Sequence, residues 1–187
     1  LGYTGLVLDE VQRGEITQLP PFSIANPNIS IADINCDGLP DYFYTDPLNN
    51  THEVFYNNGN GTFADSVGFV SFPPTVTLDQ GGVDLVDYDG DSRIDLVQKS
   101  GLETGNFVYY PNTTRFSGHD DSKPAWGEEK SFTGLFPGHA LDDPNVRTLD
   151  LNNDQRMDFM RTTPFGIVYH FNRGDYWEED GIYLFGE

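Results

Sequence analysis

The chain has 187 residues, and its 30 acidic and 10 basic side chains give a formal net charge of -20 at pH 7. Nucleic acids and anionic membrane surfaces bind clustered Lys and Arg, so we expect a chain this acidic to bind neither. No apolar run approaches the roughly 20 residues of a membrane-spanning helix, which predicts no membrane insertion. The single cysteine, Cys36, excludes an intrachain disulfide framework and a multi-cysteine zinc site.

Three segments along the chain repeat one pattern, in which a short alternating stretch precedes and follows an acidic loop. They read ISIADINCDGLPDYFY (29–44), GVDLVDYDGDSRIDLVQ (82–98) and NVRTLDLNNDQRMDFMR (145–161). Each is followed by an aromatic stretch with an Asn and a closing aromatic residue: EVFYNNGNGTF (53–63), NFVYYPNTTRF (106–116) and GIVYHFNRGDYW (166–177). Apolar residues alternate over four to six positions, which is typical of strands and not of helices. The sequence therefore predicts an all-β repeat protein.

The spacing of the repeats suggests the architecture. The loops start at Asp33, Asp87 and Asp150, so successive starts are 54 and 63 residues apart. Such a period holds about four strands with their turns, which is the size of a propeller blade. We therefore predict a single β-propeller segment over residues 1–187, with about three blades and calcium-binding acidic loops. The expected units are about 29–81, 82–144 and 145–187, with residues 1–28 closing a preceding blade.

The three acidic loops share the pattern D-x-[DN]-x-D-x-x-x-D, whose positions are numbered here from 1 to 9. Oxygen ligands at alternate positions select a hard cation, and Ca²⁺ accepts six to eight of them in flexible geometry. Two carboxylates about 4 Å apart cost on the order of 4 kcal/mol at an effective dielectric of 20, so the clusters favour a bound cation. The expected side-chain ligands are Asp33, Asn35, Asp37 and Asp41; Asp87, Asp89, Asp91 and Asp95; and Asp150, Asn152, Asp154 and Asp158. Position 7 is expected to offer a backbone carbonyl, from Leu39, Arg93 and Arg156.

The loop pattern allows two other interpretations to be tested against the sequence. An EF-hand needs a bidentate Glu at position 12. Tyr44, Gln98 and Arg161 stand there, which excludes it. Alternatively, the loops are Asx-rich turns whose side chains bond their own backbone without metal. The tight turn also favours Gly at position 6, and only Gly38 meets this, so Ser92 and Gln155 are expected to carry left-handed backbone strain.

The loops with their flanking strands resemble the FG-GAP/VCBS repeat of calcium-bearing β-propellers, over roughly residues 29–177. With the aromatic stretches that follow, they also resemble the repeats of SpvB/Tc-toxin-B-like (Rhs/YD-repeat) proteins. This resemblance implies a secreted or extracellular, toxin-associated protein whose propeller has no catalysis of its own. It implies as partners the other domains of a larger protein, or a protein assembly.

The remaining residues suggest no enzyme. The chain has no G-x-S-x-G elbow and no phosphate-binding G-x-x-x-x-G-K-[ST] loop. Two alternatives stay open: a carbohydrate-binding, lectin-like propeller, and an accessory domain of an extracellular hydrolase. The aromatic residues that could stack on a sugar are Tyr56, Tyr109, Tyr110, Tyr169, Trp126 and Trp177. Four Asn-x-Ser/Thr acceptors for glycosylation occur, at Asn28, Asn49, Asn60 and Asn112.

Overall fold

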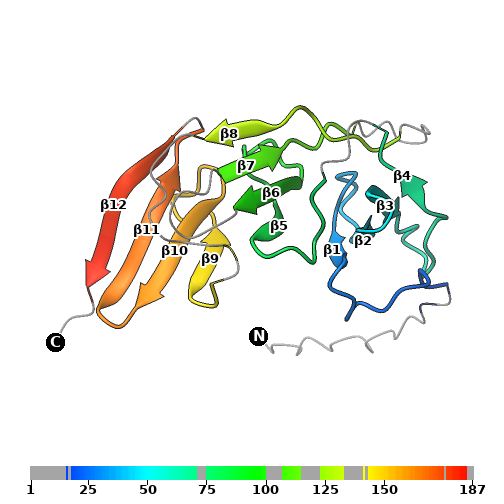
Figure 1. Ribbon diagram of the computed structural model, residues 1–187, viewed down its shortest axis with the longest axis horizontal. Coiled ribbons are helices and arrows are strands. Elements are labelled where there is room, and N and C mark those ends of the chain that lie inside the picture. The colour runs from blue at the N-terminus through cyan, green and yellow to red at the C-terminus, as the bar shows by residue number, and fades with distance from the viewer. Residues whose placement is uncertain are drawn as a thin grey trace, which may run out of the picture.

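All regular structure in the described part of the chain is β-strand (Figure 1). The structure, a computed structural model, describes residues 16, 18–70, 75–99, 107–114, 123–132, 141, 143–174 and 176–184. Within the described residues there is no helix that is long and apolar enough to cross a membrane.

Twelve strands form three separate four-stranded antiparallel sheets, which we call the first, second and third blade. The first blade holds β1 (Ile29–Ala32), β2 (Asp41–Asp46), β3 (Thr51–Phe55) and β4 (Val67–Gly68). The second holds β5 (Val83–Val86), β6 (Asp95–Lys99), β7 (Phe107–Tyr110) and β8 (Lys130–Phe132). The third holds β9 (Val146–Leu149), β10 (Asp158–Thr163), β11 (Gly166–Asn172) and β12 (Trp177–Leu184). Within each blade, every strand pairs with its neighbours in the chain, so the fold is all-β with propeller-type repeats, as the sequence predicts.

Side-chain alternation explains why these segments form strands with two packed faces. In β6, Leu96 and Val97 are both fully buried although they point to opposite sides of the sheet. Leu96 lies opposite Tyr110 of β7 and packs toward the first blade, whereas Val97 lies opposite Tyr109 and packs toward the third. The two adjacent apolar residues of this strand therefore each bury their side chain on a different face of the sheet.

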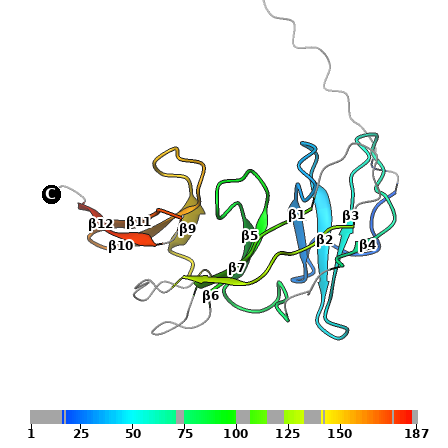
Figure 2. The ribbon, with the colours of Figure 1, turned by 90° about the horizontal axis from the view of Figure 1, so that it is seen from above.

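The three blades stand side by side, and the hydrophobic core lies in the two layers between them (Figures 1 and 2). The layer between the first and second blades contains Ile34, Phe43, Val54, Val76, Leu96 and Trp126. The layer between the second and third contains Tyr88, Val97, Phe107, Tyr109, Val146, Met157, Phe159 and Trp177. Each blade after the first thus buries a tryptophan against the blade before it.

The closing aromatic residue of the second blade differs from the prediction. The sequence pattern assigns Phe116 to this place, which lies outside the described residues. The structure instead pairs Trp126 with Asn112, as Phe63 pairs with Asn57 in the first blade and Trp177 with Asn172 in the third. The connection between Asn112 and Trp126 is longer than the connections before Phe63 and Trp177. The sequence pattern, which assumes a short connection, therefore assigned Phe116 to this place.

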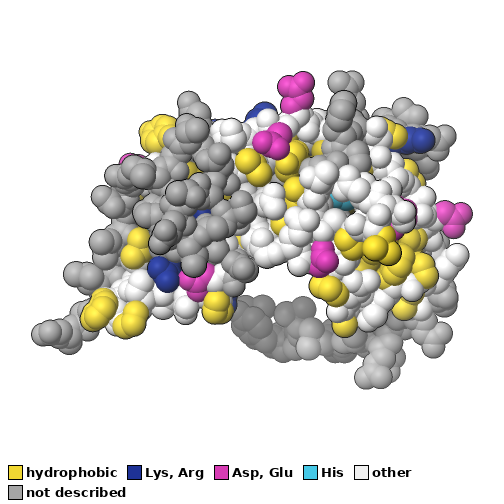
Figure 3. All heavy atoms as spheres, in the orientation of Figure 1, with side chains coloured by type: hydrophobic (Ala, Val, Ile, Leu, Met, Phe, Trp, Pro, Cys, Tyr) yellow, Lys and Arg dark blue, Asp and Glu magenta, His cyan; other side chains and the backbone are white. Residues whose placement is uncertain are grey.

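The segment before β1 packs on the first blade. Phe22 stacks on Tyr44 with ring centroids 4.3 Å apart, and Gln18 bridges to Thr62. Figure 3 shows hydrophobic side chains gathered at the right of the view, where the first blade lies. The prediction that residues 1–28 close a preceding blade stays a prediction, since residues 1–15 and 17 lie outside the described part.

Candidate metal centre

The three acidic loops occupy the same place in the three blades. Each joins the first strand of its blade to the second, and the loops project next to one another on one side of the molecule (Figure 2). Neighbouring loops also touch, since Cys36 Sγ donates to the carbonyl of Ser92 over 3.3 Å. A Cβ added to Gly90 would lie 3.2 Å from the carbonyl oxygen of Gln155 in the third loop. The fold therefore gathers the densest acidic segments of the chain into one row.

The loops share a backbone shape with two left-handed residues. At position 6, φ is +85° at Gly38, +69° at Ser92 and +71° at Gln155. The expected strain at Ser92 and Gln155 is thus present. Position 4 is also left-handed in all three loops, with Cys36, Gly90 and Asn153 at φ of 61°, 80° and 62°. The sequence pattern does not show this second requirement, because only one of the three residues is a glycine.

Side chains at positions 1 and 5 hold this shape. Asp33 Oδ2 accepts from the N–H of Gly38 at 2.9 Å, and Asp37 Oδ1 accepts from the N–H of Leu39 at 2.8 Å. The same bonds recur in the other two loops, from Ser92 and Gln155 to position 1 and from Arg93 and Arg156 to position 5. These are Asx-type bonds. They leave lone pairs on each carboxylate, because an ionised carboxylate offers about four acceptor sites.

Position 9 plays a different part in the structure. Asp41, Asp95 and Asp158 are each fully buried at the start of the second strand. One oxygen of Asp95 accepts from the N–H of Tyr88 at 3.1 Å, and the other from the N–H of Asn112 at 2.8 Å. Asp41 and Asp158 make the same pair of bonds in their own blades, at 2.8–3.0 Å. Each position 9 carboxylate therefore ties its loop to an asparagine, which lies two residues beyond the third strand in the first and second blades and ends that strand in the third.

The asparagines at these strand ends extend the ties from one blade to the next. Asn112 Nδ2 donates to the carbonyl of Ile34 in the first loop at 2.9 Å, and Asn172 Nδ2 donates to the carbonyl of Tyr88 in the second at 2.8 Å. Alternating carboxylates, peptide groups and asparagines thus form one continuous hydrogen-bonded chain from Asp41 to Asp158. No role was predicted for the repeated Asn, although its recurrence after three aromatic strands is visible in the sequence.

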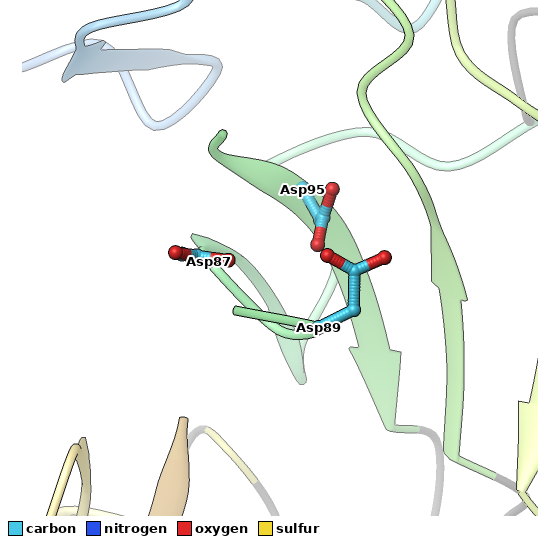
Figure 4. Close-up of side chains that lie close together, drawn as sticks. All are labelled: Asp87, Asp89 and Asp95. Carbon is cyan, nitrogen blue, oxygen red and sulfur yellow. The ribbon is translucent and has the colours of Figure 1, made fainter. Parts of the chain in front are cut away.

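The second loop brings carboxylates closest together. Asp87, Asp89 and Asp95 each offer an oxygen, and these oxygens all lie within 4.8 Å of one another (Figure 4). Asp89 Oδ1 is buried and has no hydrogen-bond partner in the structure. A buried acceptor without a partner costs about 1–3 kcal/mol, more when charged, unless a cation or donor reaches it. The site is thus a cluster of hard oxygen ligands with one oxygen unsatisfied.

Arginines contact position 5 in two loops. Arg93 Nε and Nη2 both donate to Asp91 Oδ2, at 2.9 and 2.6 Å. In the third loop, Arg173 lies 3.8 Å from Asp154. Asp91 was expected as a ligand in the second loop, yet it is paired with Arg93 and is not part of the cluster of three. Its role in metal binding stays a prediction.

In the first and third loops, position 3 is an asparagine and the side chains bond to each other. Asn35 Nδ2 donates to Asp37 Oδ2 at 3.0 Å, and Asn152 Nδ2 donates to Asp154 Oδ2 at 3.0 Å. An amide donor reduces the repulsion that a third carboxylate would add. The expected ligand sets of these loops, including the carbonyls at position 7, stay predictions.

Burial changes the protonation of the carboxylates. It raises the pKa of Asp41 to about 6 and that of Asp95 to about 7, against the lowering effect of their backbone N–H donors. The pKa of Asp87 and of Asp158 is raised by burial in the same way. A cation among these groups would favour their ionised forms, so metal binding at this site would release protons.

The structure also places the residues of the alternative functions. Trp126, Trp177 and Tyr109 are buried in the core, so they cannot stack on a sugar. Tyr56, Tyr110 and Tyr169 are partly exposed. Asn112 is buried and bonded to Ile34, which excludes it as a glycosylation acceptor in the folded chain.

Comparisons with known proteins bear on the fold and the repeat. Residues 14–97 match the FG-GAP-like repeat family. This stretch contains the first two acidic loops. No curated protein sequence matches the chain significantly. Among solved structures, one titled for the specific recognition of non-reducing terminal N-acetylglucosamine by an Agrocybe aegerita lectin is similar, with a TM-score of 0.51 and 17% identity. The match covers 80% of this chain and 36% of the lectin chain, so the chain spans about a third of that protein.

Proposed function

We propose that this chain is a calcium-binding β-propeller segment that serves as a non-catalytic scaffold or binding module of a larger secreted protein. The observation that carries the proposal is the cluster of Asp87, Asp89 and Asp95 with the buried, unpartnered Asp89 Oδ1. The match of residues 14–97 to the FG-GAP-like repeat supports a binding repeat over an enzyme. The toxin-associated setting belongs to the proposal on the resemblance of the repeats alone.

Calcium is the cation that best suits these ligands. All are oxygens, which excludes a preference for soft metals. The cluster combines side chains from a loop with one at a strand end, and no regular octahedron of ligands is apparent among three residues. Ca²⁺ tolerates such geometry at 2.3–2.6 Å, whereas Mg²⁺ demands a near-ideal octahedron and keeps its waters. We therefore place Ca²⁺ in the second loop, and we extend the proposal to the first and third loops on their shared backbone shape.

Isothermal titration with Ca²⁺, after treatment with EGTA, tests this proposal directly. The wild-type chain should bind Ca²⁺, and Asp89→Asn should lose the site in the second loop. Asp65→Asn is the matched control, because Asp65 is exposed and lies outside the three loops. At free Ca²⁺ ten times the dissociation constant, each occupied site adds about 1.4 kcal/mol to the free energy of unfolding. No heat of binding and an unchanged unfolding midpoint would instead support metal-free Asx turns.

A second candidate is carbohydrate binding, which is favoured by the similarity of the fold to that of a lectin. The tryptophans are unavailable, so the platform would use exposed aromatic residues, of which Phe165 and Tyr176 of the third blade are 78% and 55% exposed. A glycan array that includes N-acetylglucosamine-terminated glycans, probed with and without EGTA, tests it. Binding that disappears with Phe165→Ala or Tyr176→Ala would support this function. No binding to any glycan would exclude it on that array.

A further inference from the structure

A histidine is buried where the first two blades meet. His52 of β3 is 1% exposed, and its ring packs edge-on against Phe43 of β2 and against Trp126 of the second blade. Phe69, which follows β4, stacks on Trp126 with ring centroids 4.8 Å apart. We call His52, Phe43 and Phe69 the aromatic cage, because these three rings of the first blade pack against the indole ring that the second blade contributes.

Both ring nitrogens of His52 have a partner. Trp126 Nε1 lies 2.8 Å from His52 Nδ1, and His52 Nε2 lies 2.8 Å from the carbonyl oxygen of Val76. An indole N–H can only donate, and a carbonyl oxygen can only accept. Nδ1 is therefore the acceptor, and Nε2 carries the proton. The two contacts fix the neutral ring in one tautomer.

A second proton on His52 is incompatible with this arrangement. A protonated imidazole donates from both nitrogens. Its Nδ1–H would point at the indole N–H of Trp126, so two donors would face each other where one hydrogen bond now joins the blades. The positive charge would also be buried among aromatic rings, which is costly without a charged partner.

The acidic residues of β2 and β3 do not supply that partner. Asp46 and Glu53 point to the opposite side of the sheet, because side chains alternate along a strand. Asp41 shares the face of His52 but lies at the other end of β2, where two backbone N–H groups donate to it. The sheet therefore offers no carboxylate to a protonated His52.

The segments outside the sheet offer none either, among the residues that the structure describes. Asp79 accepts from the hydroxyl of Thr77, and Lys123 and Glu128, in the segment that carries the tryptophan, are exposed. Burial lowers the pKa of His52 to about 4, against the raising effect of its bond to a backbone carbonyl.

We infer that His52 is an acid-sensitive link between the first and second blades: its protonation breaks the hydrogen bond to Trp126 and releases the indole ring from the aromatic cage. The contact lies between two neighbouring blades within the chain. It therefore does not depend on what precedes the first blade or follows the third.

The size of the effect follows from the two forms of the contact. In the closed form His52 takes up a proton only near pH 4, whereas in an open, solvated form it does so near its ordinary pKa of 6.5. The closed contact is therefore at full strength above pH 6.5 and weakens as the pH falls to 4. Over that range the ratio of open to closed contact should rise by about 300-fold.

Hydrogen exchange of the indole N–H groups, followed by NMR of the full chain labelled with ¹⁵N-tryptophan, tests the inference between pH 7 and pH 4. The chain has two tryptophans, so the spectrum has two indole signals, which Trp177→Phe assigns. The matched variant is His52→Gln, because a glutamine amide can accept from Trp126 and donate to Val76 but does not titrate. Relative to this variant at the same pH, protection of Trp126 in the wild type should fall by up to about 300-fold.

Trp177 is the internal control, since it is buried between the second and third blades and should keep its protection. A ratio of wild type to His52→Gln that does not change with pH would overturn the inference. So would an equal loss of protection at both tryptophans, because that indicates unfolding of the whole chain. If far-UV circular dichroism shows that His52→Gln is unfolded, the two indole signals of the wild type decide alone. All samples contain EGTA, so the result is independent of metal binding in the loops.

Discussion

The asparagines whose side chains bond to the preceding blade allow a test of how much these hydrogen bonds contribute to stability. Asn172 is fully buried, and its Nδ2 donates to the buried carbonyl of Tyr88, while its Oδ1 accepts from the N–H of Gly174 at 2.8 Å. Asn172→Ala removes one buried and one partly buried hydrogen bond, worth about 1 kcal/mol each, and leaves the Tyr88 carbonyl unpaired at a further 1–3 kcal/mol. We expect the free energy of unfolding to fall by about 3 kcal/mol.

Asn57→Ala is the matched control at the equivalent place in the first blade. Asn57 also makes two side-chain hydrogen bonds, to the Pro40 carbonyl and from the Gly59 N–H, but both are exposed. Water replaces exposed bonds, so the loss should be about 1 kcal/mol or less. Urea unfolding of both variants measures the difference from the midpoint at constant m-value. Equal losses for the two variants would refute the argument that the link between blades stabilises the fold.

Three further predictions concern pH and the loops. Burial lowers the pKa of His52 from 6.5 to about 4, so the unfolded chain binds a proton that the folded chain does not. His52 should therefore remove about 3 kcal/mol of stability as pH falls from 6.5 to 4. Urea unfolding should show this loss in the wild type and not in His52→Gln. Gly82→Ala should cost more than about 3 kcal/mol, since its Cβ would lie 2.0 Å from the Lys99 carbonyl oxygen. Gly38→Ala, with φ of +85° but open space, should cost only about 1 kcal/mol in the same assay. Ser92→Gly should raise the thermal unfolding midpoint, because it relieves a left-handed residue at φ of 69°, and an unchanged or lower midpoint would contradict this.

The sequence predicts the strands and blades well because they depend on local patterns. Alternation in DYFYTD places Asp41, Phe43 and Thr45 on one buried face, and the structure has that burial in β2. The position of the loops between first and second strands follows from the same repeat. These features can be predicted from residues that are close together in the sequence. The three copies of the pattern make the prediction stronger than one copy would.

The partners of the loop residues could not be predicted, because they depend on contacts between distant segments. Asn112 and Ile34 are 78 residues apart in the chain, and no spacing rule joins them. The pairing of Asp91 with Arg93 is different, because the two residues are only two positions apart and the pattern D-x-R was visible in the sequence. The sequence pattern thus treats all four acidic residues of the second loop alike, whereas the structure separates Asp91 from the other three.

The carboxylate at position 9 joins the metal proposal to the packing of the blades. Asp95 belongs to the cluster of three, and its oxygens also hold the backbone of Tyr88 and Asn112. Asn112 in turn donates to Ile34 in the first loop. A cation that fixes Asp95 in its ionised form would strengthen both hydrogen bonds, because bonds to a charged acceptor are roughly twice as strong as neutral ones. Calcium in the second loop would therefore stabilise the contact with the first blade as well as the loop itself, and Asn112→Ala should reduce the stabilisation that Ca²⁺ gives to the whole chain.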